Sequence, residues 1–182
     1  MASLLDSFTA SHPAHAVVVV SNSAGAGGLR KAAERGVATA VVDHRPFAGD
    51  RVAFEVALSD ALSRYAPDFI CLAGFMRILT PSFAEKWSDK ILNIHPSLLP
   101  KYIGLNTHAR AIEAEDRFAG CSVHRLTADL DAGAVLGQAV VPILEHDTAQ
   151  DLAARVLIQE HRLYPQVLRR VLEGKDTPLY LS

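Results

Sequence analysis

The 182-residue chain has few cysteines, no excess of one charge and no long apolar run. Its two cysteines, Cys71 and Cys121, lie far apart in apolar contexts, so neither a structural disulfide nor a metal site is expected. Eighteen basic and 20 acidic residues give a net charge of -2 without a basic cluster, which argues against a nucleic-acid partner. No stretch has the composition of a membrane span or a signal peptide. These absences predict a cytoplasmic protein with no membrane partner.

What the chain does contain is 49% hydrophobic residues, enough for the core of one domain covering residues 1–182. Apolar runs alternate along it with helical patterns. Strands are expected at 15–21, 37–42, 69–73, 90–95, 122–126 and 135–141, and helices at 1–10, 29–35, 50–65, 82–87, 107–115 and 147–174. We expect Thr107 to cap its helix and Pro165 to kink or break the last one. This alternation predicts an α/β, Rossmann-like fold with a mainly parallel sheet and helices on both faces.

The segment at residues 91–100, with sequence ILNIHPSLLP, is the most informative part of the chain. Side chains alternate along a strand, so Asn93 and His95 point to the same side. Pro96 then ends the strand because it has no N–H to donate. Open α/β sheets bind ligands at the carboxyl ends of their strands. An amide and an acid/base group at this position indicate a catalytic site, with a structural histidine as the alternative.

Three further side chains are candidates, each with an ordinary structural alternative. Asp131 lies in a Leu-Asp-Ala-Gly segment and either forms a turn or orients His95. Glu160 falls on the apolar stripe of the last helix, where a carboxylate needs a ligand, a salt bridge or a route to solvent. Arg77 follows a buried strand and either meets an anion or is a surface residue. The glycines at 25–28 lack phosphate-loop spacing and indicate a flexible loop.

Several longer motifs occur in a fixed order and carry a resemblance to a known family. They are LAGFMRIL at 72–79, NIHPSLLP at 93–100, GLNTH at 104–108, SVH at 122–124, LDAG at 130–133, and QEH at 159–161 followed by YP at 164–165. Together they resemble the folate-dependent formyltransferase family over essentially the whole chain. The resemblance implies the formyltransferase fold. It also implies transfer of a formyl group from 10-formyltetrahydrofolate to the amine of glycinamide ribonucleotide, a step of de novo purine biosynthesis, without a metal.

The resemblance also implies roles for individual residues. The catalytic residues would be Asn93, His95 and Asp131. The reduced folate would be held by Arg51, Met76, Arg77, Ile78, Leu79, Asn93, Thr127, Ala128, Asp129, Leu130 and Asp131. The ribonucleotide would contact Pro96, Leu157, Ile158, Gln159 and Glu160.

Two departures from the family pattern keep other functions open. The family begins with a central strand and a glycine-rich phosphate loop, and neither precedes residue 1 here, so we expect an N-terminally truncated domain or a mis-assigned start. Ile103 stands where members acting on the ribonucleotide usually have proline, and in this it is closer to formyltetrahydrofolate deformylases. The alternatives are therefore a hydrolase of formyltetrahydrofolate and an inactive folate-binding fragment. We expect a monomer or a homodimer.

Overall fold

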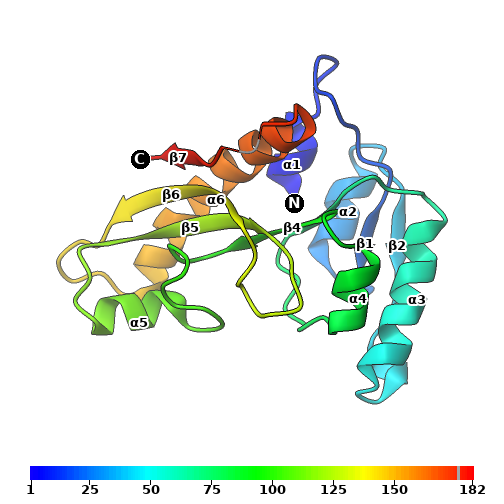
Figure 1. Ribbon diagram of the computed structural model, residues 1–182, viewed down its shortest axis with the longest axis horizontal. Coiled ribbons are helices and arrows are strands. Elements are labelled where there is room, and N and C mark those ends of the chain that lie inside the picture. The colour runs from blue at the N-terminus through cyan, green and yellow to red at the C-terminus, as the bar shows by residue number, and fades with distance from the viewer. Residues whose placement is uncertain (176) are drawn as a thin grey trace.

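The computed structural model describes residues 1–175 and 177–182, whose strands form two sheets (Figure 1). The larger sheet has the strand order β3 (Ile70–Leu72), β4 (Ile91–His95), β5 (Phe118–Arg125), β6 (Val135–Pro142) and β7 (Leu179–Leu181). The smaller sheet pairs β1 (Val19–Ser21) with β2 (Thr39–Val41) in parallel. The strand β7 has only three residues and was not expected from the sequence.

The five-stranded sheet is mixed because one strand runs against the others. Strand β3 is parallel to β4, and β6 is parallel to β7, whereas β5 is antiparallel to both of its neighbours. Four of the five strands therefore share a direction. The α/β class is confirmed, and β5 is the exception to a parallel sheet. A short loop at residues 126–134 joins β5 to β6, and a connection of this length permits only an antiparallel pair.

Helices cover both faces of this sheet, as the alternating pattern predicts. The helices are α1 (Ala2–Ser7), α2 (Gly27–Ala33), α3 (Arg51–Ser63), α4 (Pro81–Lys86), α5 (Thr107–Glu113) and α6 (Ala149–Leu172), with a 3-10 turn at Arg45–Phe47. Leu92 packs in the cluster formed with α6, whereas the adjacent Ile91 packs with residues of α3 and α4. Adjacent side chains of a strand point to opposite faces, so α6 lies on one face and α3 and α4 on the other. None of the described helices has the length and apolar character needed to cross a membrane.

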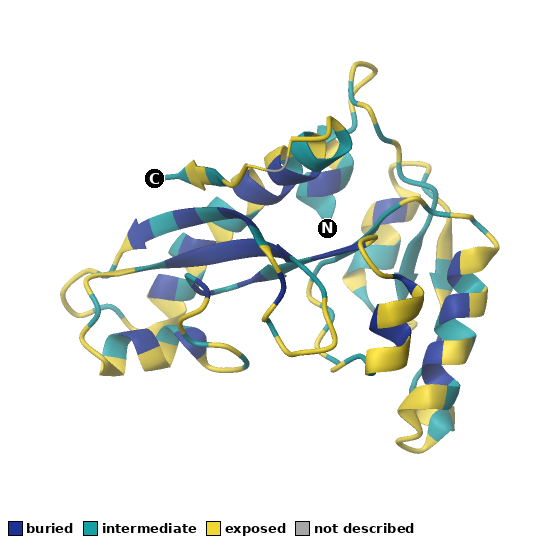
Figure 2. Ribbon diagram, viewed as in Figure 1, coloured by how far each residue is buried: buried dark blue, intermediate teal, exposed yellow. Residues whose placement is uncertain are grey.

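The long helix α6 carries the main core of the molecule. It begins with a capping box, in which the side chains of Thr148 and Asp151 each accept from the other's backbone N–H. The buried positions follow the stripe predicted from the sequence, and Figure 2 shows the matching buried positions along β5 and β6. The helix continues through Pro165 to Leu172, so of the kink or break expected at the proline, the break does not occur. Leu163 and Val167, on either side of the proline, stay packed against the sheet and hold the helix together.

The strand β1 is shorter than the seven residues expected, since only Val19–Ser21 pair with β2. Its other edge faces β3 across a cleft of about 540 Å³. Residues 17–21 and 69–73 line the cleft, together with apolar side chains of α1, α3 and α6. No ladder joins β1 to β3 within the described residues. The cleft therefore separates the two sheets at a position where a continuous sheet would have a further strand.

The start of α5 also differs from the expectation. Asn106, with a φ of 57°, occupies the N-cap position, and Thr107 is the first helical residue. The hydroxyl of Thr107 donates to the carbonyl of Pro96 at 2.7 Å instead of capping the helix. This bond ties α5 to the segment that follows β4, which is the segment nearest the candidate site.

Candidate active site

The strand β4 presents Asn93 and His95 on one face, as alternation predicts. Asn93 is directly opposite His124 of β5, and His95 is opposite Ser122. Opposite residues of an antiparallel pair lie on the same face within side-chain reach. This face is the one that α6 does not cover, because Leu92 and Val123 point towards α6. The candidate site therefore lies on the opposite side of the sheet from the main core.

Asp131 reaches these side chains from the loop that joins β5 to β6. Its Oδ2 lies 3.4 Å from Nδ1 of His95, and both side chains are less than 10% exposed, at 8% and 7%. The same oxygen accepts the backbone N–H of Gly104 at 3.0 Å. Its Oδ1 lies 3.6 Å from Nε2 of His124. The structure thus places His95 beside Asp131, and His124, hydrogen-bonded to Asn93, joins them.

The loop at residues 96–107 holds the other nitrogen of His95. Because a carbonyl oxygen only accepts, Nε2 of His95 donates to the carbonyl of Tyr102 at 2.9 Å. The beginning of this loop is anchored on β5. The hydroxyl of Ser122 donates to the carbonyl of Ser97 at 2.6 Å and accepts the N–H of Leu99 at 3.0 Å. The imidazole of His95 therefore sits between a backbone carbonyl and a carboxylate, both held by fixed hydrogen bonds.

The structure explains why residue 133, at the end of the Leu-Asp-Ala-Gly segment, is glycine. A Cβ on Gly133 would lie 1.8 Å from the carbonyl oxygen of Arg125, a distance that no side chain tolerates. The loop also closes through the N–H of Arg125, which donates to the carbonyl of Ala134 at 3.0 Å. Asp131 itself adopts a left-handed φ of 51°, which aspartate accepts more readily than most residues. These features bring the loop back over the sheet towards His95.

His124 is the site residue for which the sequence provided no role. It is 1% exposed, its Nε2 lies 3.1 Å from Nδ2 of Asn93, and its Nδ1 lies 2.9 Å from the carbonyl oxygen of Arg125. Burial lowers the pKa of His124 below its ordinary value. The Ser-Val-His motif drew attention to this residue. Its place opposite Asn93 depends on the strand register, which the motif alone does not reveal.

The residues expected to hold folate lie mostly on the surface of the molecule. Met76, Ile78 and Leu130 are 78%, 59% and 49% exposed, which is unusual for apolar side chains. The loop residues Thr127, Ala128 and Asp129 are also exposed, and Leu79 is half-buried.

The two arginines of the expected folate set differ in their surroundings. Arg51 begins α3 and is exposed. Arg77 is half-buried and lies over the ring of Phe54 at 5.5 Å, a cation–π contact that orients its guanidinium. Neither arginine touches Asn93, His95 or Asp131 through a hydrogen bond or an ion pair within the described residues.

The residues expected to bind the ribonucleotide are spread over two regions. Pro96 follows β4, whereas Leu157, Ile158, Gln159 and Glu160 lie on α6, where the first two are 47% and 61% exposed. Burial raises the pKa of Glu160, and the N-terminal amino group of Met1 opposes this shift. Within the described residues the Glu160 carboxylate has neither a hydrogen bond nor an ion pair, and it does not contact the group around His95.

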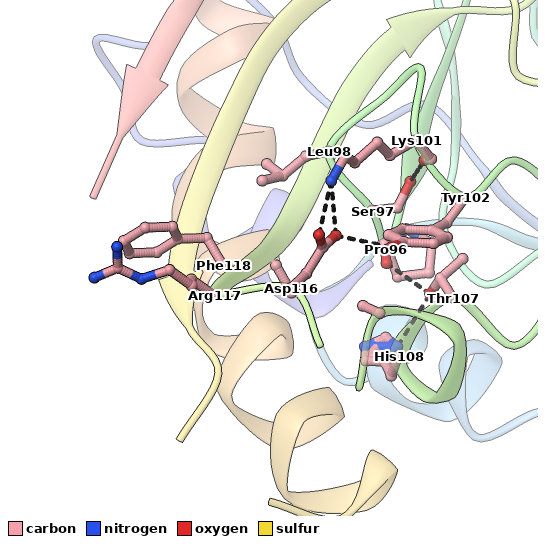
Figure 3. Close-up of a pocket in the computed structure, with 12 residues that line it drawn as sticks. Pro96, Ser97, Leu98, Lys101, Tyr102, Thr107, His108, Asp116, Arg117 and Phe118 are labelled. Atoms are coloured by element: carbon pink, nitrogen blue, oxygen red, sulfur yellow. Dashed lines mark hydrogen bonds and ion pairs between the residues drawn. The ribbon is translucent and has the colours of Figure 1, made fainter. Parts of the chain in front are cut away.

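A pocket of about 200 Å³ lies on the other side of the 96–107 loop and is lined by Pro96 but by none of Asn93, His95 or Asp131 (Figure 3). At its rim, Nζ of Lys101 lies 2.8 Å from both carboxylate oxygens of Asp116, and the Tyr102 hydroxyl donates to the same group at 2.7 Å. These contacts fix the loop from the outside, and Tyr102 then presents its carbonyl to His95 on the inside.

Neither cysteine has the properties of a nucleophile. Burial raises the pKa of Cys71 to about 11 and that of Cys121 to about 12, so both thiols are protonated near neutral pH. The chemistry available at the site is therefore hydrogen-bond donation by an amide and proton transfer by an imidazole that a carboxylate orients.

Comparison with known proteins agrees with this fold. The family model described as formyl transferase matches residues 2–168, so the chain belongs to the formyl transferase family. Among curated proteins, the chain is 46% identical over 157 residues to phosphoribosylglycinamide formyltransferase of Escherichia coli (strain K12), covering 86% of this chain and 74% of that protein.

Longer relatives match equally well. The chain is 47% identical to the trifunctional purine biosynthetic protein adenosine-3 of Gallus gallus over 88% of its own length, but it spans only 16% of that protein. Among solved structures, phosphoribosylglycinamide formyltransferase from Brucella melitensis superposes with a TM-score of 0.89 at 47% identity, covering 96% of this chain and 90% of that one. The formyltransferase fold expected from the sequence is thereby confirmed.

Proposed function

We propose that the chain transfers a formyl group from 10-formyltetrahydrofolate to the amine of glycinamide ribonucleotide, as a step of purine biosynthesis. The observation that carries this proposal is the grouping of Asn93, His95 and Asp131 on a family-matched fold, with the His95 imidazole 3.4 Å from a carboxylate. An amide donor beside an oriented imidazole suits acyl transfer to an amine. The reaction requires no covalent intermediate and no metal.

The proposed mechanism begins when the substrate amine attacks the formyl carbon and forms a new C–N bond. The formyl oxygen becomes an oxyanion, which an N–H of Asn93 stabilises, a contribution of about 2.7–4 kcal/mol at comparable sites. His95 accepts or relays the proton of the attacking nitrogen and returns it to the departing folate nitrogen as that C–N bond breaks. Asp131 orients the ring and favours its charged form during this transfer.

The binding surfaces follow from exposure. The exposed apolar side chains of Met76, Ile78 and Leu130 lie on the segments expected to form the folate site, and a bound pterin would remove them from water. Arg51, Arg77, Leu79, Asn93 and the loop from Thr127 to Asp131 complete this proposed folate site. Glu160, with its neighbours on α6 and Pro96, contacts the ribonucleotide, and the partial burial that raises the pKa of its carboxyl favours an interaction with hydrogen-bond donors of the substrate.

The test is an assay of 10-formyltetrahydrofolate consumption with and without the ribonucleotide. Ribonucleotide-dependent turnover, lost by a factor of about 100 or more in His95→Ala, is the expected result. Consumption that proceeds equally well without ribonucleotide would identify a hydrolase, to which Ile103 points. Folate binding without turnover under either condition would identify an inactive fragment.

We further propose that the cleft between β1 and β3 receives one more strand, which joins the two sheets and completes the family domain. Its apolar lining supports this proposal, as do the facing edges of β1 and β3, which are unpaired within residues 1–175 and 177–182. A version of the chain extended before Met1 by an apolar strand and a glycine-rich loop is expected to melt higher and to bind the ribonucleotide more tightly. A matched extension with lysines at the inward positions is the control. Equal melting temperatures for the two extended chains would contradict the proposal.

We infer that the protein acts in the cytoplasm, where its two cysteines remain reduced, as a monomer or a homodimer. Sedimentation analysis of the chain, with and without the strand extension, distinguishes these states, because an open sheet edge favours association.

A further inference from the structure

The imidazole of His124 is held in one tautomer by its surroundings. Its Nδ1 lies 2.9 Å from the carbonyl oxygen of Arg125, and a carbonyl only accepts, so the ring proton is on Nδ1. In the neutral ring Nε2 is then an acceptor. Nδ2 of Asn93 lies 3.1 Å from Nε2, and it can donate.

We propose that His124 is a positioning residue that fixes the orientation of the Asn93 amide by accepting one of its N–H groups. This inference rests on the proposed formyl transfer. The oxygen and nitrogen ends of an asparagine amide have nearly the same shape. Rotation of the amide by 180° therefore exchanges its N–H donors for its carbonyl acceptor. With one N–H bound to Nε2, the second remains available to the formyl oxygen. A rotated amide would instead turn its carbonyl towards that oxygen and repel the developing negative charge.

The charge state of His124 decides whether this contact exists. The titratable groups that act on it are Asp131, whose Oδ1 lies 3.6 Å from Nε2, and His95. Asp131 favours the protonated ring, whereas burial and the charge of His95 oppose it, and burial is the largest effect on the pKa of His124. A protonated His124 would donate from Nε2 to Asp131 and leave the Asn93 amide without its acceptor.

The position of the Arg125 carbonyl, which selects the tautomer of His124, depends on the glycine at position 133. This carbonyl occupies the space where a side chain on residue 133 would be, since a Cβ on Gly133 would lie 1.8 Å from it. The N–H of the same residue, Arg125, is bonded to Ala134. Gly133 thus leaves room for the Arg125 carbonyl, the carbonyl accepts from Nδ1 of His124, and Nε2 of His124 accepts from the Asn93 amide.

Two substitutions of His124 by side chains of similar shape distinguish the effect of its hydrogen bond to Asn93 from the effect of its packing. Glutamine in His124→Gln has a side-chain oxygen that can accept from Asn93, whereas methionine in His124→Met has nearly the same shape without a strong acceptor. We expect His124→Gln to keep kcat within about tenfold of wild type and His124→Met to lose about 100-fold, the loss that removal of one such donor causes. Equal kcat values for two folded variants would overturn the proposal.

Nitrogen-15 NMR of the wild-type histidine rings tests the tautomer without any substitution. The expected result is a proton on Nδ1 and a bare Nε2 at neutral pH. A proton on Nε2 at this pH would overturn the proposal. Because the measurement uses the wild-type protein, it does not depend on the folding of any variant. The two failures are distinguishable. A wild-type protein that does not turn over ribonucleotide refutes the proposed function, whereas an active wild-type protein with the wrong tautomer refutes only the role of His124.

Discussion

Replacement of Asp131 by asparagine is the sharpest test of the proposed site. The amide oxygen of asparagine can still accept the N–H of Gly104, which lies 3.0 Å from the carboxylate in the wild-type protein. The loop therefore keeps its anchor, and the substitution removes mainly the negative charge beside His95. Both side chains are nearly buried, so solvent screens their interaction only weakly.

The size of the effect follows from the distance between the two groups. Two unit charges 3.4 Å apart interact by about 5 kcal/mol at an effective dielectric constant of about 20. If about half of this attraction is gained only when the imidazole is charged in the transition state, the barrier rises by about 2.5 kcal/mol. That change corresponds to a fall in kcat of roughly 50- to 100-fold.

The measurement is kcat at saturating formyl folate and ribonucleotide, with circular dichroism and thermal melting to show that Asp131→Asn is folded. Asp60→Asn, an exposed change on α3, controls for the loss of one surface carboxylate and should leave kcat unchanged. A folded Asp131→Asn variant that keeps more than about a third of the wild-type kcat would refute the electrostatic reasoning.

Three other outcomes follow from packing and burial. Gly120→Ala should destabilise the protein by about 3 kcal/mol in chemical denaturation, because its Cβ would lie 1.9 Å from a carbonyl oxygen of β6, whereas Gly25→Ala has nothing within 4 Å and should be neutral. A carboxyl whose folded pKa is raised loses its stabilising contribution as pH rises through that pKa, so Glu160→Gln should melt roughly 2–4 °C higher than wild type at pH 8 but not at pH 4. Cys71 and Cys121 should resist alkylation at pH 8 until the protein unfolds, and rapid labelling of folded protein by mass spectrometry would contradict their raised pKa values.

Some of the site was predictable from local rules. The common side of Asn93 and His95 follows from strand alternation, and the structure has both on one face of β4. The apolar stripe of α6 follows from helical spacing, and Leu152, Val156 and Leu163 are fully buried as that spacing predicts. These are properties of neighbouring residues, so a single segment of sequence is sufficient to reveal them.

Other features depend on contacts that no segment contains. The role of His124 requires the register between β4 and β5, which pairs His124 with Asn93, 31 positions away in the sequence. The reach of Asp131 depends on a loop folding back over the sheet, and the sequence offered contact with His95 only as an alternative to an ordinary turn. The length of β1 depends on which neighbours are present, since residues 15–18 have strand-forming side chains but no pairing partner in the described part of the chain.

The separation of the two sheets has a consequence for how the molecule opens. Among the residues that the structure describes, strands β1 and β2 share no ladder hydrogen bond with the five-stranded sheet, so their amides can exchange with solvent while the larger sheet stays intact. Hydrogen exchange should therefore divide the chain into two cooperative units, with Val19–Ser21 exchanging through partial opening and Leu92 or Val123 only through global unfolding. His95, on β4, belongs to the slower unit, so the imidazole of the proposed site is held by the part of the chain that opens last.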